Sequence, residues 1–291
     1  MASSPRPRRT ALYLPGENAR ALEKAAGLPA DVVVLDLEDS VTPEAKGAAR
    51  RRVAEAVRAE GFGHREVLVR VNGLETPWFH DDMAAIAPTG PDGILVPKVS
   101  RPSDVHAVED ALDLAAPPAD TMLWAMLETS RAVLDATSLV SASSRLVGFM
   151  LGTNDLAREL RAVHVPGRGP LLPAIAWCLL AVRDAGKVVI DGVFNDLDDH
   201  DGFAAECQQA RELGFDGKSV IHPRQLEVAN AAFTPGAEEV EHAREVIAAF
   251  DEATTAGRGV VTVRGRLVEN LHVEEARRLL ALAERISARP G

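Results

Sequence analysis

Short apolar runs, many of them β-branched, alternate with longer amphipathic or charged segments along most of the chain. Such runs, bounded by polar or turn residues, are typical of parallel strands that are buried on both faces. We therefore expect eight strands with helices between them. The expected strands are 10–14, 32–37, 67–72, 93–99, the runs beginning at 122 and 146, 188–193, and a strand within 214–223.

Eight strand–helix units favour a closed TIM (β/α)8 barrel over an open parallel sheet. A Rossmann fold is the alternative, but no Gly-x-Gly-x-x-Gly follows the first strand. The chain has 291 residues, of which 46% are hydrophobic, and a barrel of about 250 residues leaves room for an extension. We expect a disordered basic tail over 1–9, the barrel over 10–233 and a C-terminal extension over 234–291.

The extension departs from the strand–helix alternation. Its pattern predicts a long amphipathic helix over 238–256, a hairpin-like run over 260–268 and a final helix over 273–288. Because these elements lie outside the eight units, we expect them to cover the barrel mouth of the same subunit or of a neighbouring one.

Composition narrows the functional classes. The net charge of −11 argues against a nucleic-acid scaffold, and no apolar run approaches the roughly 20 residues of a transmembrane helix. The chain has two cysteines, too few for a disulfide framework or a Cys-x-x-Cys metal site. We therefore expect a cytoplasmic protein that works on small molecules.

Two acids follow the fifth and sixth strands, Glu128 and Asp155. The C-terminal ends of parallel barrel strands open on one face, so both carboxylates are expected side by side at the mouth. Two carboxylates, with water and substrate completing the shell, suit Mg²⁺. The alternative is two ordinary acids at strand ends.

Further charged residues follow the first four strands. The crowded acids Asp36, Glu38 and Asp39 need a nearby cation or hydrogen-bond donors. Arg70, within the third strand, needs an anion from a protein carboxylate or a substrate, and Lys98 closes the fourth strand. Arg20 and Lys24 share a helix face and are candidates to receive a phosphate, or form a solvated face.

Three other segments are candidate sites. The Gly/Pro loop over 164–170 is either a mobile lid or a plain connector. The acidic loop over 195–199 is a candidate for a second cation, although surface acids are the better interpretation. Gly217-Lys218-Ser219 invites a Walker A interpretation, which fails because Glu212 occupies the position of the first required glycine.

Seven motifs, taken together, resemble citrate lyase β-subunit-like proteins of the HpcH/HpaI aldolase and malyl-CoA lyase superfamily. They occur in the order of that family and cover nearly the whole chain. The motifs are Leu-Pro-Gly-Glu-Asn-Ala-Arg (14–20), Leu-Asp-Leu-Glu-Asp-Ser-Val (35–41), Val-Arg-Val-Asn (69–72), Val-Pro-Lys (96–98), Leu-Glu-Thr (127–129), Asn-Asp-Leu (154–156) and Gly-Phe-Asp-Gly-Lys-Ser-Val-Ile-His-Pro (214–223).

The resemblance implies a TIM barrel, commonly a homotrimer or a dimer of trimers, that binds Mg²⁺ (or Mn²⁺) through Glu128 and Asp155. It implies that Arg70 contacts the substrate's keto-acid or enolate oxygens, and that Arg20 and Lys24 hold coenzyme A phosphates. The other implied site residues are Gly152, Thr153, Asn154 and Lys98 for substrate, Glu38 and Asp39 to orient metal-bound water or Arg70, and Glu269 as an acid/base that reaches an adjacent subunit's site.

Three departures from the family pattern bear on the substrate. Asn154 replaces an acid next to Asp155, Glu269 replaces an aspartate, and Ala174-Ile175 replaces an Ala-Arg pair. The resemblance implies a Mg²⁺-dependent carbon–carbon lyase that cleaves a β-hydroxyacyl-CoA, such as malyl-, citramalyl- or citryl-CoA, into acetyl-CoA and a keto acid through an enolate. The alternatives are a Mg²⁺-dependent aldolase on a free hydroxy-keto acid, through pyruvate enolate, and a non-catalytic subunit that binds an acyl carrier or partner.

Overall fold

The computed structural model describes residues 6–289. The chain divides into two compact units, one spanning Arg8–Phe233 and the other formed by Thr234–Gly291 with the segment Met1–Pro7. Of the disordered tail predicted over 1–9, residues 1–5 lie outside the described residues. Arg8 and Arg9 lie within the described residues, and their guanidinium groups pair with Glu66 at 2.5 Å and Asp31 at 2.8 Å.

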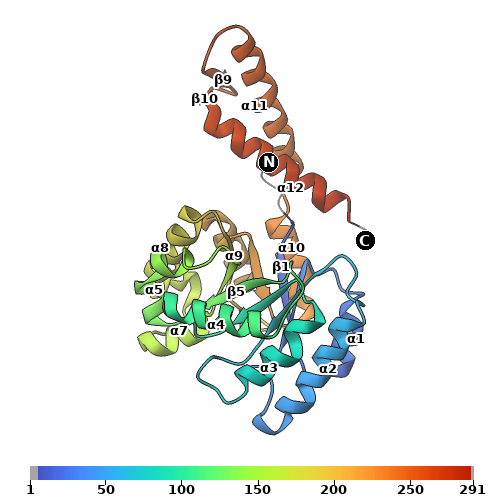
Figure 1. Ribbon diagram of the computed structural model, residues 1–291. Helices are drawn as coiled ribbons and strands as arrows, with labels where there is room; N and C mark the ends of the chain where they lie inside the picture. The colour runs from blue at the N-terminus through green and yellow to red at the C-terminus, as the bar shows by residue number, and fades with distance from the viewer. Residues whose placement is uncertain (1–5, 290–291) are drawn as a thin grey trace. The chain divides into compact units, whose positions relative to one another are not determined.

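The first unit is a closed barrel of eight parallel strands, which confirms the predicted TIM barrel (Figure 1). Each strand pairs with the next, and the barrel closes where Thr10 to Leu12 pair with Lys218 to Val220. The strands are β1 (Thr10–Pro15), β2 (Val32–Asp36), β3 (Glu66–Arg70), β4 (Gly93–Val96), β5 (Met122–Leu127), β6 (Leu146–Leu151), β7 (Val188–Asp191) and β8 (Gly217–Val220).

Helices surround the strands in the order that the amphipathic segments predict (Figure 1). The α-helices are α1 (Ala19–Ala25), α2 (Lys46–Arg58), α3 (Phe79–Ile86), α4 (Pro102–Leu114), α5 (Ser130–Leu134), α6 (Ala136–Val140), α7 (Thr153–Leu160), α8 (Leu172–Asp184), α9 (His200–Leu213) and α10 (Leu226–Phe233). Short 3₁₀ turns are η1 (Pro43–Ala45), η2 (Ala87–Thr89), η3 (Pro166–Arg168) and η4 (Pro223–Gln225).

The strands bury side chains on both faces, as a parallel barrel requires. Outward-facing residues pack beneath the helices in the larger core. Inward-facing residues form a second core along the barrel axis that includes Val32, Val34, Leu68, Trp124 and Met126. Successive side chains in a strand point to opposite faces. The residue two positions after an inner-core residue therefore also faces the inside of the barrel, and at the end of the strand it lies at the barrel mouth.

The second unit contains the expected helix, hairpin and helix. These elements are α11 (Ala237–Thr255), an antiparallel pair of β9 (Val261–Val263) and β10 (Arg266–Val268), and α12 (Asn270–Ser287). They share a small apolar core that includes Ala243, Val246 and Val273. The unit therefore has its own packing, and its predicted role as a cover remains a prediction.

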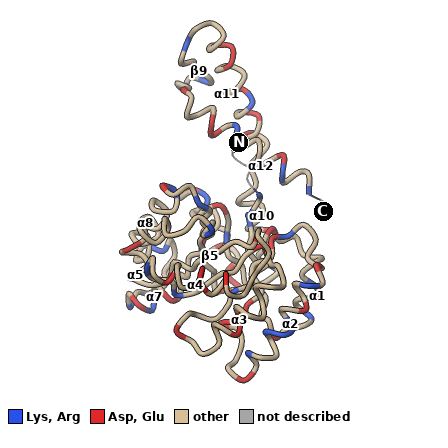
Figure 2. The backbone as a smooth tube through the Cα atoms, in the orientation of Figure 1, with Lys and Arg blue, Asp and Glu red and all other residues tan. Residues whose placement is uncertain are grey.

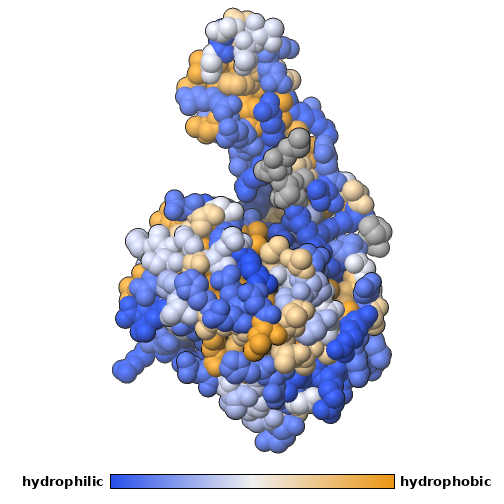
Figure 3. Space-filling model, in the orientation of Figure 1, coloured by the Kyte–Doolittle hydropathy of each residue, from blue (hydrophilic) through white to orange (hydrophobic). Residues whose placement is uncertain are grey.

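The surface carries mixed charge. Basic and acidic residues are interspersed along the outer helices, α2 and α11 among them (Figure 2). Hydrophobic residues are exposed in patches among hydrophilic ones on the face shown in Figure 3.

No helix within residues 6–289 is both long and apolar enough to cross a membrane. Cys178 and Cys207 are buried free thiols.

Candidate functional site

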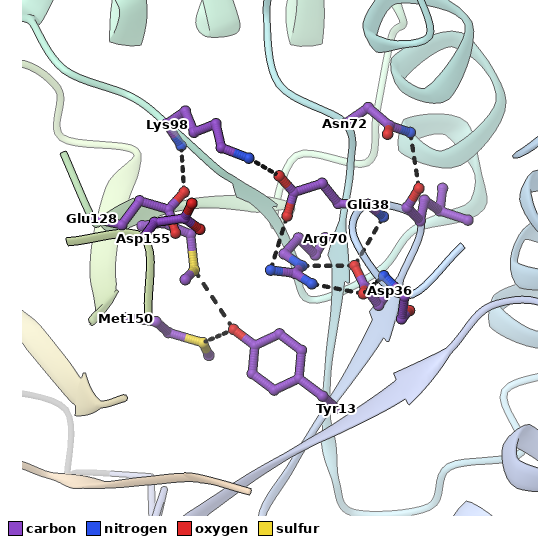
Figure 4. Close-up of polar contacts among 12 residues, drawn as sticks. Tyr13, Asp36, Glu38, Arg70, Asn72, Lys98, Glu128, Met150 and Asp155 are labelled. Atoms are coloured by element: carbon purple, nitrogen blue, oxygen red, sulfur yellow. Dashed lines mark hydrogen bonds and ion pairs between the residues drawn. The ribbon is translucent and has the colours of Figure 1, made fainter. Parts of the chain in front are cut away.

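The inner-face alternation places four polar residues at the C-terminal ends of the strands. Asp36 follows Val32 and Val34 on the same face of β2, Arg70 follows Leu68 on β3, and Glu128 follows Trp124 and Met126 just beyond β5. Tyr13 lies on the matching face of β1 (Figure 4). They line a cavity of about 360 Å³, together with Pro15, Asp39, Ser40, Met126, Leu151, Gly152, Thr153, Asn154, Asp155, Val193, Asn195 and Ile221.

Asp36 and Arg70 form a buried bidentate ion pair. The Arg70 Nε and Nη2 atoms donate to the Asp36 carboxylate at 2.6 and 2.7 Å, and the backbone N–H groups of Glu38 and Ser40 donate to it as well. Burial raises the pKa of Asp36, but the Arg70 guanidinium outweighs burial and holds that pKa below its usual value. Asp36 is therefore a permanent carboxylate that orients Arg70.

Glu38 links Arg70 to Lys98. Its carboxylate forms ion pairs with Arg70 Nη1 at 2.9 Å and with Lys98 Nζ at 2.6 Å (Figure 4). Burial raises the pKa of Glu38, and the two cations oppose that rise. The anion that Arg70 requires is thus a pair of protein carboxylates, Asp36 and Glu38. Its predicted contact with substrate oxygens remains a prediction, although Arg70 lines the cavity.

Glu128 is a buried carboxylate without such a guanidinium pair. Lys98, whose backbone has φ of +59°, donates its N–H to Glu128 Oε1 at 2.8 Å. Gly152 makes room for the side chain, because a Cβ there would lie 2.2 Å from Glu128 Oε2. Burial, with the charges of Glu38 and Asp155 adding to it, raises the pKa of Glu128 to about 8. Among the described residues Glu128 has no ion-pair partner, and the charge of Arg70 only partly opposes the rise.

Asp155 lies beside Glu128 in Figure 4. The sixth strand ends with its apolar run at Leu151, so Asp155 occupies the first turn of α7 rather than the strand end. Its Oδ1 accepts from Arg158 Nη2 at 2.5 Å, and that arginine is 74% exposed. We call Asp36, Glu38, Arg70, Lys98, Glu128 and Asp155 the mouth cluster.

Two buried side chains, Lys46 and Asn72, hold the loop after β2 through hydrogen bonds to its backbone. Lys46 Nζ donates to the backbone carbonyls of Leu37 and Glu38 at 2.8 and 2.7 Å. Asn72 Nδ2 donates to the Leu37 carbonyl at 3.0 Å and to Asp82 at 2.6 Å. Because both donors are buried, Glu38 is fixed in place before any ligand binds.

The other predicted site residues divide into three groups. Gly152, Thr153, Asn154 and the exposed Asp39 line the cavity. Arg20 and Lys24 are exposed on α1, outside the residues that line it. Glu269 caps α12 in the C-terminal unit. The roles assigned to these residues remain predictions.

Tyr13 and Asn195 are among the cavity residues that were not predicted as site residues. Tyr13 directs its hydroxyl at the sulfur atoms of Met126 and Met150, at 3.6 and 3.4 Å, and stacks its ring under Arg70. Asn195 exchanges amide hydrogen bonds with Asn154, at 2.8 and 3.2 Å. The alternation of Ala11 and Tyr13 would have indicated the first residue; nothing local distinguishes Asn195 in its acidic loop.

The donor set fits a hard divalent cation. Glu128 and Asp155 offer carboxylate oxygens to one cavity. Burial and the neighbouring carboxylates together raise the pKa of Glu128, and a cation between the two groups would favour its ionised form. Within residues 6–289, no group of three or more His, Cys, Asp or Glu side chains is placed to share a metal ion. Water and substrate would therefore complete the shell, and the acidic loop over 195–199 does not form a second such group.

The fold and cavity define a TIM barrel with an acidic, metal-competent mouth. A profile of the HpcH/HpaI aldolase/citrate lyase family matches residues 9–223. The chain belongs to this family, which confirms the resemblance of its motifs.

Three similar proteins bear on function. The chain is 47% identical to a (3S)-malyl-CoA thioesterase from Cereibacter sphaeroides, over 99% of both chains. It is 35% identical to an L-malyl-CoA/beta-methylmalyl-CoA lyase from the same species, covering 97% of this chain and 96% of the lyase. The crystal structure of CitE from Mycobacterium tuberculosis in complex with magnesium, acetoacetate and coenzyme A superposes with a TM-score of 0.75 at 29% identity, covering 94% of this chain and 97% of that one.

Proposed function

We propose that the protein is a Mg²⁺-dependent hydrolase of a malyl-CoA-type thioester, which it converts with water into the free hydroxy acid and coenzyme A. The observation that carries the proposal is the 47% identity, over 99% of both chains, to a (3S)-malyl-CoA thioesterase. This reaction was not among the sequence-based predictions, which favoured carbon–carbon cleavage of the same class of thioester.

The mouth cluster supports chemistry at a carbonyl group. Glu128 and Asp155 would hold the metal, and bound Mg²⁺ would polarise the thioester carbonyl as a Lewis acid. Arg70, fixed by Asp36 and Glu38, presents a guanidinium to the cavity, where it favours negative charge on a substrate oxygen. Asp39 places a carboxylate on the cavity wall, where it can accept a proton from water.

A second candidate function uses the same site. Cleavage of the carbon–carbon bond in malyl-CoA leaves an enolate on acetyl-CoA and releases glyoxylate. The guanidinium of Arg70 would stabilise the enolate oxygen by the same electrostatic effect. The observation that favours this reaction is the 35% identity to a malyl-CoA lyase over nearly the full length of both chains.

The remaining site assignments belong to the same proposal. We place the coenzyme A phosphates at Arg20 and Lys24, which lie one turn apart on α1 directly after β1, and we assign Glu269 as an acid/base from an adjacent subunit. The magnesium and coenzyme A in the Mycobacterium CitE structure support this set of ligands. A homotrimeric assembly and a cytoplasmic location are part of the proposal.

One assay separates the two reactions. Protein with Mg²⁺ is incubated with (3S)-malyl-CoA, while free thiol and glyoxylate are measured in parallel. Hydrolysis releases thiol without glyoxylate, whereas cleavage releases glyoxylate and acetyl-CoA without thiol. If neither product forms, the thioester proposal is wrong, and a free hydroxy-keto acid tested in the same assay then examines the aldolase alternative.

Metal dependence is tested separately. Chelation should abolish turnover, and added Mg²⁺ should restore it. Full activity in a chelated, metal-free preparation would remove Mg²⁺ from the proposal while leaving the substrate assignment intact.

A further inference from the structure

A second group of buried charges lies outside the mouth cluster, on the outer side of the barrel wall. Asp191 ends β7 and Lys218 lies in β8, and both are fully buried. Lys218 Nζ donates to Asp191 at 2.8 Å, to Glu206 of α9 at 2.6 Å and to the Gly192 carbonyl at 2.7 Å. Arg168 Nη1 donates to both oxygens of Asp191 at 2.8 Å. We call Arg168, Asp191, Glu206 and Lys218 the outer cluster.

Arg168 reaches this cluster from an irregular loop between α7 and α8. It has φ of +56° and follows Gly167 at φ of +74°, so two consecutive residues adopt the left-handed region. That conformation is unfavourable for a non-glycine residue and persists where surrounding contacts enforce it. Here the enforcing contacts are the Asp191 pair and a hydrogen bond from Arg168 Nε to Gln209 at 2.9 Å, and the side chain is only 4% exposed.

The end of β7 is in turn packed against the start of α7. A Cβ at Gly192 would lie 2.6 Å from Thr153 Oγ1, so these two residues are in close contact. Three residues further on, Asn195 pairs with Asn154 through both amide groups. The segment after Asp191 therefore braces the first turn of α7, which carries Asp155.

We propose that Arg168 is a positioning residue of the candidate site. By holding Asp191 at the end of β7, it fixes Gly192 and Asn195, and through them the α7 turn that presents Asp155. The Gly/Pro loop over 164–170, which the sequence leaves open as a lid or a connector, then acts as a brace from outside the barrel. The inference rests on the proposed function only for its kinetic readout.

A matched pair of variants tests this role. Arg161 lies in the same loop and also has a positive φ, of +53°, but its side chain is exposed. Arg168→Met and Arg161→Met therefore make the same chemical change at similar backbone conformations, and only the first removes a buried cation. Arg168→Lys keeps the charge and serves as the conservative variant if Arg168→Met does not fold.

Hydrogen exchange of the full-length, metal-free protein gives a readout that is independent of turnover. Arg168→Met should speed exchange in 192–197 and in 153–157, with Arg168→Lys intermediate, while 93–99 around Lys98 and all segments of Arg161→Met stay at the wild-type rate. Faster exchange confined to 162–171, or equal exchange in the two methionine variants, would overturn the proposal.

Kinetics tests the consequence. A displacement of about 1 Å at a site can cost about 100-fold in rate, so Arg168→Met should lower kcat by about 10- to 100-fold with KM nearly unchanged. Altered exchange with an unchanged kcat would reduce Arg168 to a structural residue and overturn the positioning role. If wild-type protein turns over neither thioester nor free acid, the proposed function fails, and the exchange result still decides the brace.

Discussion

The mouth cluster and the outer cluster are both networks of mostly buried carboxylates and cations, but their charges are balanced differently. The outer cluster sets two carboxylates against two cations, with each carboxylate contacted by both cations. The mouth cluster holds four carboxylates, and its two cations, Arg70 and Lys98, serve Asp36 and Glu38. Glu128 and Asp155 are left beside each other at the cavity, with only the largely exposed Arg158 paired to Asp155.

This difference separates a structural network from a reactive one. A balanced buried network needs nothing further, and removal of one member leaves an uncompensated charge. In an unbalanced network, burial and neighbouring like charges together raise the pKa of a member, as at Glu128, or the network recruits a cation. The two clusters should therefore respond in opposite ways to neutralisation of a carboxylate.

Glu128→Gln should give the largest effect on function. Loss of a carboxylate from the unbalanced cluster should abolish measurable Mg²⁺ binding in calorimetry and lower turnover at least about 100-fold, the scale of losing one electrostatic stabiliser of a developing charge. At pH 7 the metal-free variant should melt close to wild type, because a pKa of about 8 keeps most of Glu128 protonated and glutamine is likewise neutral. Glu227→Gln, at an exposed position on α10, is the control, and a variant that retains Mg²⁺ affinity would contradict the assigned ligand.

Asp191→Asn should give the largest effect on stability. The substitution leaves Arg168 and Lys218 short of a buried counter-charge, and breaking a buried pair typically costs about 3–5 kcal/mol. Denaturant unfolding measures the change, with Asp201→Asn, exposed in the first turn of α9, as the matched control. A free energy of unfolding within about 0.5 kcal/mol of wild type, the range typical of surface substitutions, would show that the outer cluster is not the tight network that its distances imply.

The strands that organise both clusters were predictable from the sequence, because continuous apolar runs indicate strands buried on both faces. The side-by-side position of Glu128 and Asp155 follows from the parallel strand direction, although Asp155 lies in a helix rather than at a strand end. Which carboxylate each buried cation pairs with was not predictable. Lys98 pairs with Glu38, and Arg168 pairs with Asp191 across 23 residues of sequence, and these pairs depend on contacts between loops that no local pattern encodes.

The pH dependence that Glu128 gives to stability and to Mg²⁺ affinity should be a smaller effect than those of the two substitutions, but its direction is defined. With its pKa raised from 4.5 to about 8, the folded metal-free protein binds a proton more tightly than the unfolded chain. The contribution of Glu128 to stability, measured relative to Glu128→Gln, should therefore be largest below about pH 4.5 and fall as the pH rises towards 8. Below pH 8, Mg²⁺ must displace this proton, so its apparent affinity should rise with pH and level off above about 8.

Calorimetry of Mg²⁺ binding at pH 7 in two buffers of different ionisation enthalpy measures this proton release directly. The observed enthalpy should depend on the buffer in wild type. Equal enthalpies in the two buffers would mean that Glu128 is already ionised, and the electrostatic contrast between the two clusters would then be wrong.

The smallest expected effect concerns the two exposed cations on α1. If Arg20 and Lys24 hold coenzyme A phosphates, the double change to alanine should raise the KM for the thioester about tenfold with kcat nearly constant, since exposed ion pairs each contribute at most about 1 kcal/mol. Added salt should raise the wild-type KM towards that of the variant, because salt screens exposed charges. The control is the double change of Arg51 and Arg58, which are exposed on α2, to alanine. Equal KM values in the two double variants would show that Arg20 and Lys24 belong to a solvated helix face.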